Sequence, residues 1–171
     1  MTDWQLDPID RLSGRGERAT LEGMLDAYRA EVVRKVAGVT EDEARRRLVP
    51  SMTTLGGLVK HLRWVEVAWF QQRFAGVPKD QFPGEPSSED VEFQLQPDES
   101  VASVVADYER ACERSREIAA GRSLDDTVPH HALGQLSLRW IYVHMIEETA
   151  RHAGHADILR ELTDGTVGDW R

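Results

Sequence analysis

The chain has 171 residues and a formal net charge of −9, with 30% charged and 40% hydrophobic residues. This length is typical of one globular domain, and the composition is too apolar for general disorder. The excess of acidic residues would repel phosphate backbones, which argues against a nucleic-acid partner. We therefore expect a single domain that spans residues 1–171.

The sequence also lacks signals for membranes and for disulfides. No stretch reaches the roughly 20 apolar residues that cross a bilayer, and the acidic opening MTDWQLDPIDR is unlike a signal peptide. We expect a cytoplasmic protein with no membrane partner. Cys112 is the only cysteine, which excludes an internal disulfide and a cysteine-based zinc site within one chain, and its surroundings indicate a small core residue of a helix.

The first long helix is predicted from about Glu17 to Val36, where apolar residues recur at steps of three and four. Thr40 and Glu43 have the spacing of a capping box, which predicts a short helix ending near Arg47. This short helix would connect the first long helix to the second.

A second long helix is predicted to begin after Thr53 or Thr54 and to run to Gly76, with an apolar stripe along one side. Residues 77–98 contain four prolines among glycines, serines and acids, and they show no helical period. They predict a long surface loop of the kind that often frames a site.

The second half of the chain predicts two further long helices. One should run from about Glu99 to Ala120 and end at Gly121, and the other from about Leu136 to Thr163, ending at Gly165. The segment around residues 129–131 should be irregular. Four long amphipathic segments without a strand pattern predict an all-α protein, a four-helix bundle with a long connection between helices two and three.

Four side chains able to coordinate a metal lie on one face of the last predicted helix. His144, Glu148, His152 and His155 are spaced by four, four and three residues, so they span an arc of roughly 80° on the side that also carries apolar residues. Such polar groups are costly inside a bundle unless each finds a partner, and a bound cation is an efficient one. Either i, i+4 pair, His144 with Glu148 or Glu148 with His152, can converge on one ion.

The second predicted helix can supply a further ligand, because His61 lies on the flank of its apolar stripe. A set of one carboxylate and two imidazoles leaves coordination positions open for water or substrate. The alternative is that these histidines are core residues satisfied by hydrogen bonds, but a cluster of this size favours a metal. His130 and His131 adjoin a proline in a loop and are not expected to be ligands.

Three tryptophans flank the predicted site along the chain, namely Trp64, Trp69 and Trp140. They can form an aromatic wall of a pocket for a cofactor or substrate, for which Trp64 and Trp140 are the candidates. Ordinary core packing is the competing explanation for at least two of the three.

Two segments, TLGGLVKHLRWVEVAWF and YVHMIEETARHAGHADILRELTDG, resemble the DinB/YfiT-like superfamily, in the branch sometimes labelled mini-circle protein. The resemblance implies a four-helix bundle, commonly a homodimer, that holds one divalent metal through His61, Glu148 and His152. Many relatives have histidine where this chain has Glu148, but the set is similar to that of mycothiol-dependent maleylpyruvate isomerase. His155 would then lie near the metal.

The same resemblance implies, as our leading hypothesis, an enzyme in which Zn, or else Ni, Mn or Fe, activates a low-molecular-weight thiol such as mycothiol, or water, for attack on a small electrophile. His155 or His144 would accept the released proton. Two alternatives remain open: a non-enzymatic bundle that binds metal or a ligand for stability or sensing, and a structural homodimer whose polar face is a hydrogen-bonded seam.

Overall fold

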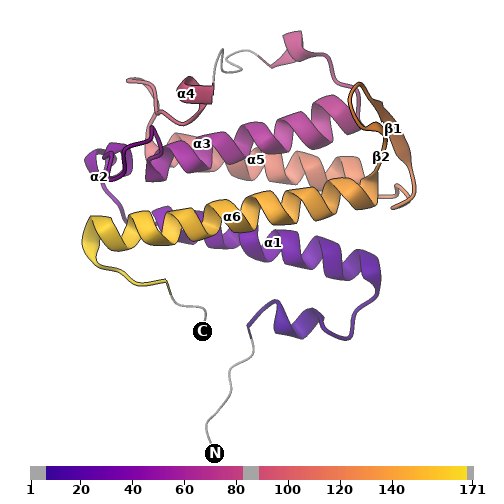
Figure 1. Ribbon diagram of the computed structural model, residues 1–171, viewed down its shortest axis with the longest axis horizontal. Helices are drawn as coiled ribbons and strands as arrows, with labels where there is room; N and C mark the ends of the chain where they lie inside the picture. The colour runs from indigo at the N-terminus through magenta and orange to yellow at the C-terminus, as the bar shows by residue number, and fades with distance from the viewer. Residues whose placement is uncertain (1–6, 83–88, 169–171) are drawn as a thin grey trace, which may run out of the picture.

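The structure is a computed structural model that describes residues 7–82 and 89–168. It is mainly helical, with one short pair of strands, so the expectation of an all-α protein is confirmed as far as the predominance of helices. The longest helices lie side by side (Figure 1). They are α1 (Glu17–Val36), α3 (Leu55–Glu66), α5 (Val101–Ala119) and α6 (Leu138–Asp164).

Shorter helical elements join and extend these helices. The predicted capping box of Thr40 and Glu43 is formed at the start of α2, with the side chain of each residue bonded to the backbone N–H of the other. A π-helical stretch continues α3, and its last turn is closed by a bond from the Ala75 N–H to the Phe70 carbonyl. The short elements are η1 (Asp10–Leu12), α2 (Glu41–Arg45), the π-helical η2 (Val67–Phe74), η3 (Lys79–Gln81) and α4 (Glu89–Glu92).

The core is formed where α1 packs on α6 and α3 packs on α5. One apolar cluster fills the half near the start of α3, and a second fills the half that contains Leu25, Phe70 and Met145. Between α1 and α3 the fully buried Glu66 accepts two hydrogen bonds from Arg29, at 2.8 and 2.7 Å. A buried carboxylate is tolerated there because its charge is paired in bidentate geometry.

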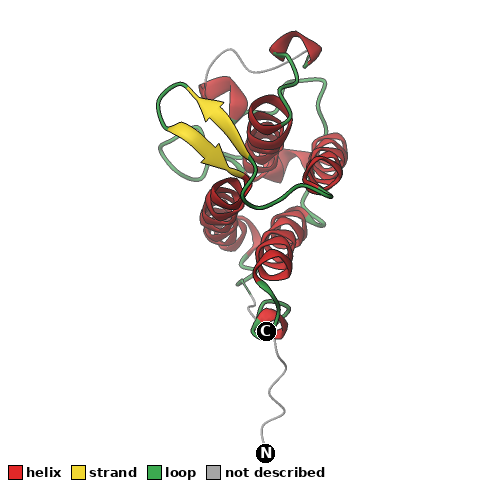
Figure 2. Ribbon diagram, turned by 90° about the vertical axis from the view of Figure 1, so that its right-hand side faces the viewer, coloured by secondary structure: helices red, strands yellow, loops and turns green. Residues whose placement is uncertain are grey.

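The expected irregular segment around residues 129–131 is instead part of a β-hairpin, so that expectation was wrong. Strands β1 (Thr127–His130) and β2 (Gly134–Ser137) pair antiparallel, with Val128 opposite Leu136 and His130 opposite Gly134. Gly134 has a φ of +77°, which suits glycine at the end of a three-residue hairpin loop. The hairpin lies across the end of the molecule at which α6 begins (Figure 2).

The helix boundaries agree closely with the predicted ones, and Gly121 and Gly165 adopt positive φ just beyond α5 and α6. The segment 77–98 was predicted to have no helix, but it contains η3 and α4, while residues 83–88 lie outside the described part of the chain. Within the described residues, no helix is long and apolar enough to cross a membrane.

Candidate metal centre

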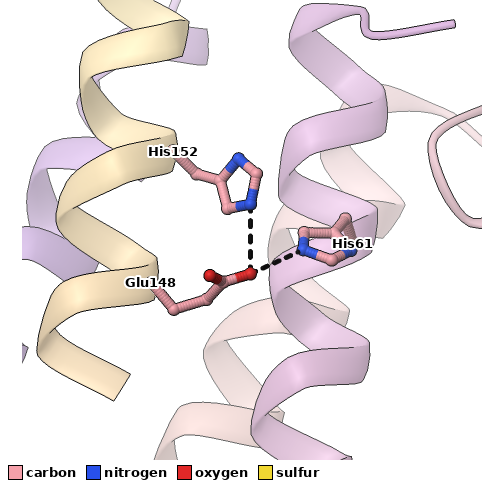
Figure 3. A group of neighbouring side chains, drawn as sticks. All are labelled: His61, Glu148 and His152. Atoms are coloured by element: carbon pink, nitrogen blue, oxygen red, sulfur yellow. Dashed lines mark hydrogen bonds and ion pairs between the residues drawn. The ribbon is translucent and has the colours of Figure 1, made fainter. Parts of the chain in front are cut away.

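His61, Glu148 and His152 come together between α3 and α6 (Figure 3). Thr54 caps the start of α3 by accepting a hydrogen bond from the Gly57 N–H at 3.0 Å, and the helix then places His61 toward α6. Glu148 and His152 are four residues apart on α6, so their side chains lie one turn apart on the same face. Helix α3 thus presents one imidazole, and α6 presents one imidazole and one carboxylate. All three groups point to a common position between the helices.

The spacing of the donor atoms suits a small divalent cation. Glu148 Oε1 lies 3.2 Å from His61 Nε2 and 3.2 Å from His152 Nε2. Bonds of about 2.0 to 2.1 Å would separate neighbouring donors of a tetrahedral zinc ion by about 3.3 Å. One donor atom from each side chain lies within 4.8 Å of the others. The three residues therefore fit a metal by donor type, and both pairs that include Glu148 also fit by spacing.

The hydrogen bonds of this cluster set its electrostatics. Burial disfavours a charged His61 ring, but hydrogen bonds to Glu148 and Glu92 outweigh it and raise the pKa of His61 to about 9. Hydrogen bonds from His152 and His61 hold the pKa of Glu148 well below its usual value, against the opposing effect of burial. Glu148 is therefore an anion at neutral pH, which is the form that binds a cation.

Glu92 is a residue of the site that the sequence did not predict. Its Oε1 accepts a hydrogen bond from His61 Nδ1 at 2.9 Å, and the neighbouring Phe93 ring stacks on the His61 ring with centroids 4.3 Å apart. Both residues come from the segment that was predicted to be a loop without helix. The sequence held one signal, the pair Gly56 and Gly57 inside an apolar helix, which indicates close approach of another backbone.

The two histidines predicted as proton acceptors lie on opposite sides of the cluster along α6. His155 is exposed, with its Nδ1 3.3 Å from Nδ1 of His152. His144 is partly buried between two tryptophan rings, with Trp69 at 4.3 Å and Trp140 at 5.2 Å. Burial lowers the pKa of both histidines, so both are neutral bases near pH 7.

The tryptophans occupy different surroundings. Trp64 is buried against Val67 and Ala111, which leaves its ring little open surface. Trp140 is 39% exposed and stacks on His144, and the hairpin adds His130 beside Trp69 at 6.3 Å. The structure thus places Trp140 in a partly open aromatic group with His144, one turn of α6 from Glu148, and places Trp64 in the packed core.

The fold is similar to that of a solved protein with low sequence identity. The crystal structure of a conserved protein from Enterococcus faecalis matches with a TM-score of 0.72 and 13% identity, covering 90% of this chain and all of that one. At this identity the likeness concerns the fold alone.

The amino-acid sequence shows the family of the chain more directly than the fold does. No curated protein matches the sequence. The family model described as mycothiol-S-transferase matches residues 20–165, a span that includes all three residues of the cluster. The resemblance to DinB-like proteins is thereby confirmed, and the chain belongs to the mycothiol-S-transferase family of the DinB/YfiT-like group.

Proposed function

We propose that the chain is a metal-dependent thiol S-transferase that joins a low-molecular-weight thiol, with mycothiol as the first candidate, to a small electrophile. The observation that carries the proposal is the convergence of His61, Glu148 and His152 on one point in a chain of this family. We further propose that the long helices form a four-helix bundle of the DinB type, with a long connection between α3 and α5, as one domain over residues 1–171.

In this proposal His61, Glu148 and His152 would hold one divalent cation, with Zn first and Ni, Mn or Fe as alternatives. A bound cation would lower the pKa of a nearby thiol and so supply a thiolate at neutral pH. The ring of His155 or His144 takes up the proton that leaves the thiol, since both imidazoles are neutral near pH 7. The sulfur then forms a bond to the electrophilic carbon, and the leaving group departs with the electron pair of the broken bond.

The surroundings of the cluster support a small-molecule substrate. His61 and Glu148 are partly buried, with 12% and 17% of their side chains exposed, whereas His152 is buried, so we propose that reactants approach from the side of His61 and Glu148. His144, one turn before Glu148, stacks with Trp140, which is two turns before Glu148, and such a pair offers a flat surface to a planar electrophile. We propose a cytoplasmic homodimer that binds neither nucleic acid nor a membrane.

The test is the rate at which mycothiol reacts with an aryl chloride whose thioether product is coloured. We expect the zinc-loaded protein to accelerate this reaction. The rate with His61→Ala should be at least about 100-fold lower than with the wild type, because the cation is no longer held. Glu147→Ala is the matched control, since this exposed carboxylate of α6 pairs with Arg151 and lies outside the cluster. Acceleration that survives His61→Ala or a strong chelator would refute the proposal.

A second function is favoured by one specific observation. Glu148 Oε1 is already hydrogen-bonded to both imidazoles, so the cluster is satisfied without any ion. This suits a non-enzymatic protein that binds metal or a ligand for stability or sensing, or a structural polar seam. A wild-type protein that binds zinc tightly but accelerates none of the thiol reactions with mycothiol, cysteine or glutathione would favour the binding role.

A further inference from the structure

Residues 91–99, here called the clamp segment, are fixed to the side of α3 that carries His61. Lys60 donates hydrogen bonds to the Gln94 carbonyl at 2.9 Å and to Glu99 Oε2 at 2.8 Å. Lys60 is itself buried, and the same Glu99 carboxylate accepts a hydrogen bond from the Gln96 N–H at 2.6 Å. A buried ammonium group with two partners in one segment holds that segment in a defined place.

A glycine of α3 allows the clamp segment to approach this closely. A Cβ atom on Gly57 would lie 1.8 Å from the Phe93 carbonyl oxygen and 2.6 Å from its carbonyl carbon. No side chain fits there without displacing the backbone of the clamp segment. Glycine weakens a helix relative to alanine, so its presence at this position is explained by the contact it permits.

The clamp segment contacts the His61 ring through Glu92 and Phe93. Phe93 stacks on one face of the imidazole with an angle of 19° between the rings, and Glu92 accepts the Nδ1–H at 2.9 Å. An ionised carboxylate can only accept, so this bond keeps the proton on Nδ1 and directs the Nε2 atom toward Glu148 and His152. Carboxylate partners of this kind orient metal-bound histidines and raise the basicity of the ring.

We propose that Glu92 is a positioning residue for the metal centre: it fixes the orientation and the tautomer of His61, and Gly57, Lys60 and Phe93 hold it in place. The inference rests on the proposed function, because it assumes that His61 binds a cation through Nε2. It adds a fourth side chain, from a part of the chain distant from the three ligands in sequence, whose loss should weaken metal binding without removing a ligand.

The test is the zinc dissociation constant, measured by competition with a coloured chelator at pH 7.5. We expect Glu92→Ala to weaken zinc binding about 10- to 100-fold. Glu92→Gln keeps an acceptor oxygen and should lose less than about tenfold. Asp98→Asn removes one negative charge from an exposed position of the same segment, so it is the control for charge alone and should change affinity less than about twofold.

Two further readouts separate positioning from general loosening. In zinc-loaded protein with ¹⁵N-labelled histidine, we expect the His61 Nδ1 proton to be visible in the wild type and lost by exchange with water in Glu92→Ala. Gly57→Ala should also weaken zinc binding, and its effect should be much smaller in the Glu92→Ala background because the two residues act through one contact.

The outcomes distinguish this inference from the proposed function. Zinc bound equally tightly by the wild type and Glu92→Ala would overturn the inference alone. A wild-type protein that binds none of Zn, Ni, Mn or Fe would overturn the proposed function and the inference together. Losses that Asp98→Asn reproduces would also overturn the inference, since they would arise from net charge rather than from the contact with His61.

Discussion

Glu148 is the residue on which the chemistry of the cluster depends. It is the only carboxylate among the three proposed ligands, and one of its oxygens is 3.2 Å from each imidazole. In the metal-free protein this arrangement favours a negative Glu148 beside a protonated His61. A bound cation would replace the proton that His61 shares with Glu148. The negative charge of Glu148 is therefore balanced by protonated His61 when no metal is bound, and would be balanced by the cation when one is.

The metal-free protein should therefore lose stability as the pH rises above neutrality. The pKa of His61 is raised from 6.5 to about 9, so its contribution to the folded state is complete below pH 6.5 and disappears as the pH approaches 9. We expect the melting temperature in chelator to fall over this interval, as measured by circular dichroism. His61→Gln should lack this fall, and an identical fall in the variant would show that another group causes it.

Cys112 should be chemically inert in the folded protein. Its thiol lies in the core, and burial raises its pKa well above the usual value, so little thiolate exists at neutral pH. We expect iodoacetamide to modify Cys112 rapidly in urea and very slowly in native buffer. Cys112→Ala should keep its bound metal and cost about 1 kcal/mol of stability. Rapid alkylation of the native protein, or loss of metal in the variant, would contradict this assignment.

Among the elements, α1 and α3 are joined by the buried pair of Arg29 and Glu66. Glu66→Gln removes the charge that balances a buried guanidinium, so we expect it to cost about 3 to 5 kcal/mol in urea unfolding. The double variant Arg29→Met with Glu66→Leu removes both charges and should recover much of that loss. A single variant as stable as the wild type would show that the pair is not effectively desolvated.

The long helices could be predicted from the sequence because each combines an apolar period with strong end signals. Gly121 and Gly165, for example, provide the positive φ that ends α5 and α6. The hairpin could not be predicted in this way, because its strands are four residues long and one contains Pro129. Its pairing depends on the Gly134 turn and on packing that brings Leu136 into the core.

His61, Glu148 and His152 were all predicted as a group, whereas their contacts with Glu92 and Phe93 were not. Helical spacing is enough to place Glu148 and His152 together, and His61 was predicted from its position on the flank of an apolar stripe and matched again through the family resemblance. Glu92 reaches His61 only through tertiary contacts of the clamp segment, and no local period of the sequence encodes such contacts. The same reason explains Trp64, which was a candidate for a pocket wall but is packed against Ala111.

On the scale of the whole molecule, α6 carries exposed apolar side chains, and we propose that they form the interface of the proposed homodimer. Val143, Ile158 and Leu162 are all exposed on this helix. If the chain is a homodimer that uses this surface, Ile158→Asp should shift the mass in light scattering from two chains to one. A wild-type protein that is already monomeric at high concentration would contradict the proposed dimer.

The metal content of the protein tests the proposed site most directly. Untagged protein purified without chelators should contain about one divalent metal ion per chain by elemental analysis, and His61→Ala and Glu148→Ala, purified in parallel, should contain almost none. Wild-type protein that is free of metal and also fails to bind added Zn, Ni or Mn would contradict the account. In that case the hydrogen-bonded cluster would be a structural seam of the helices.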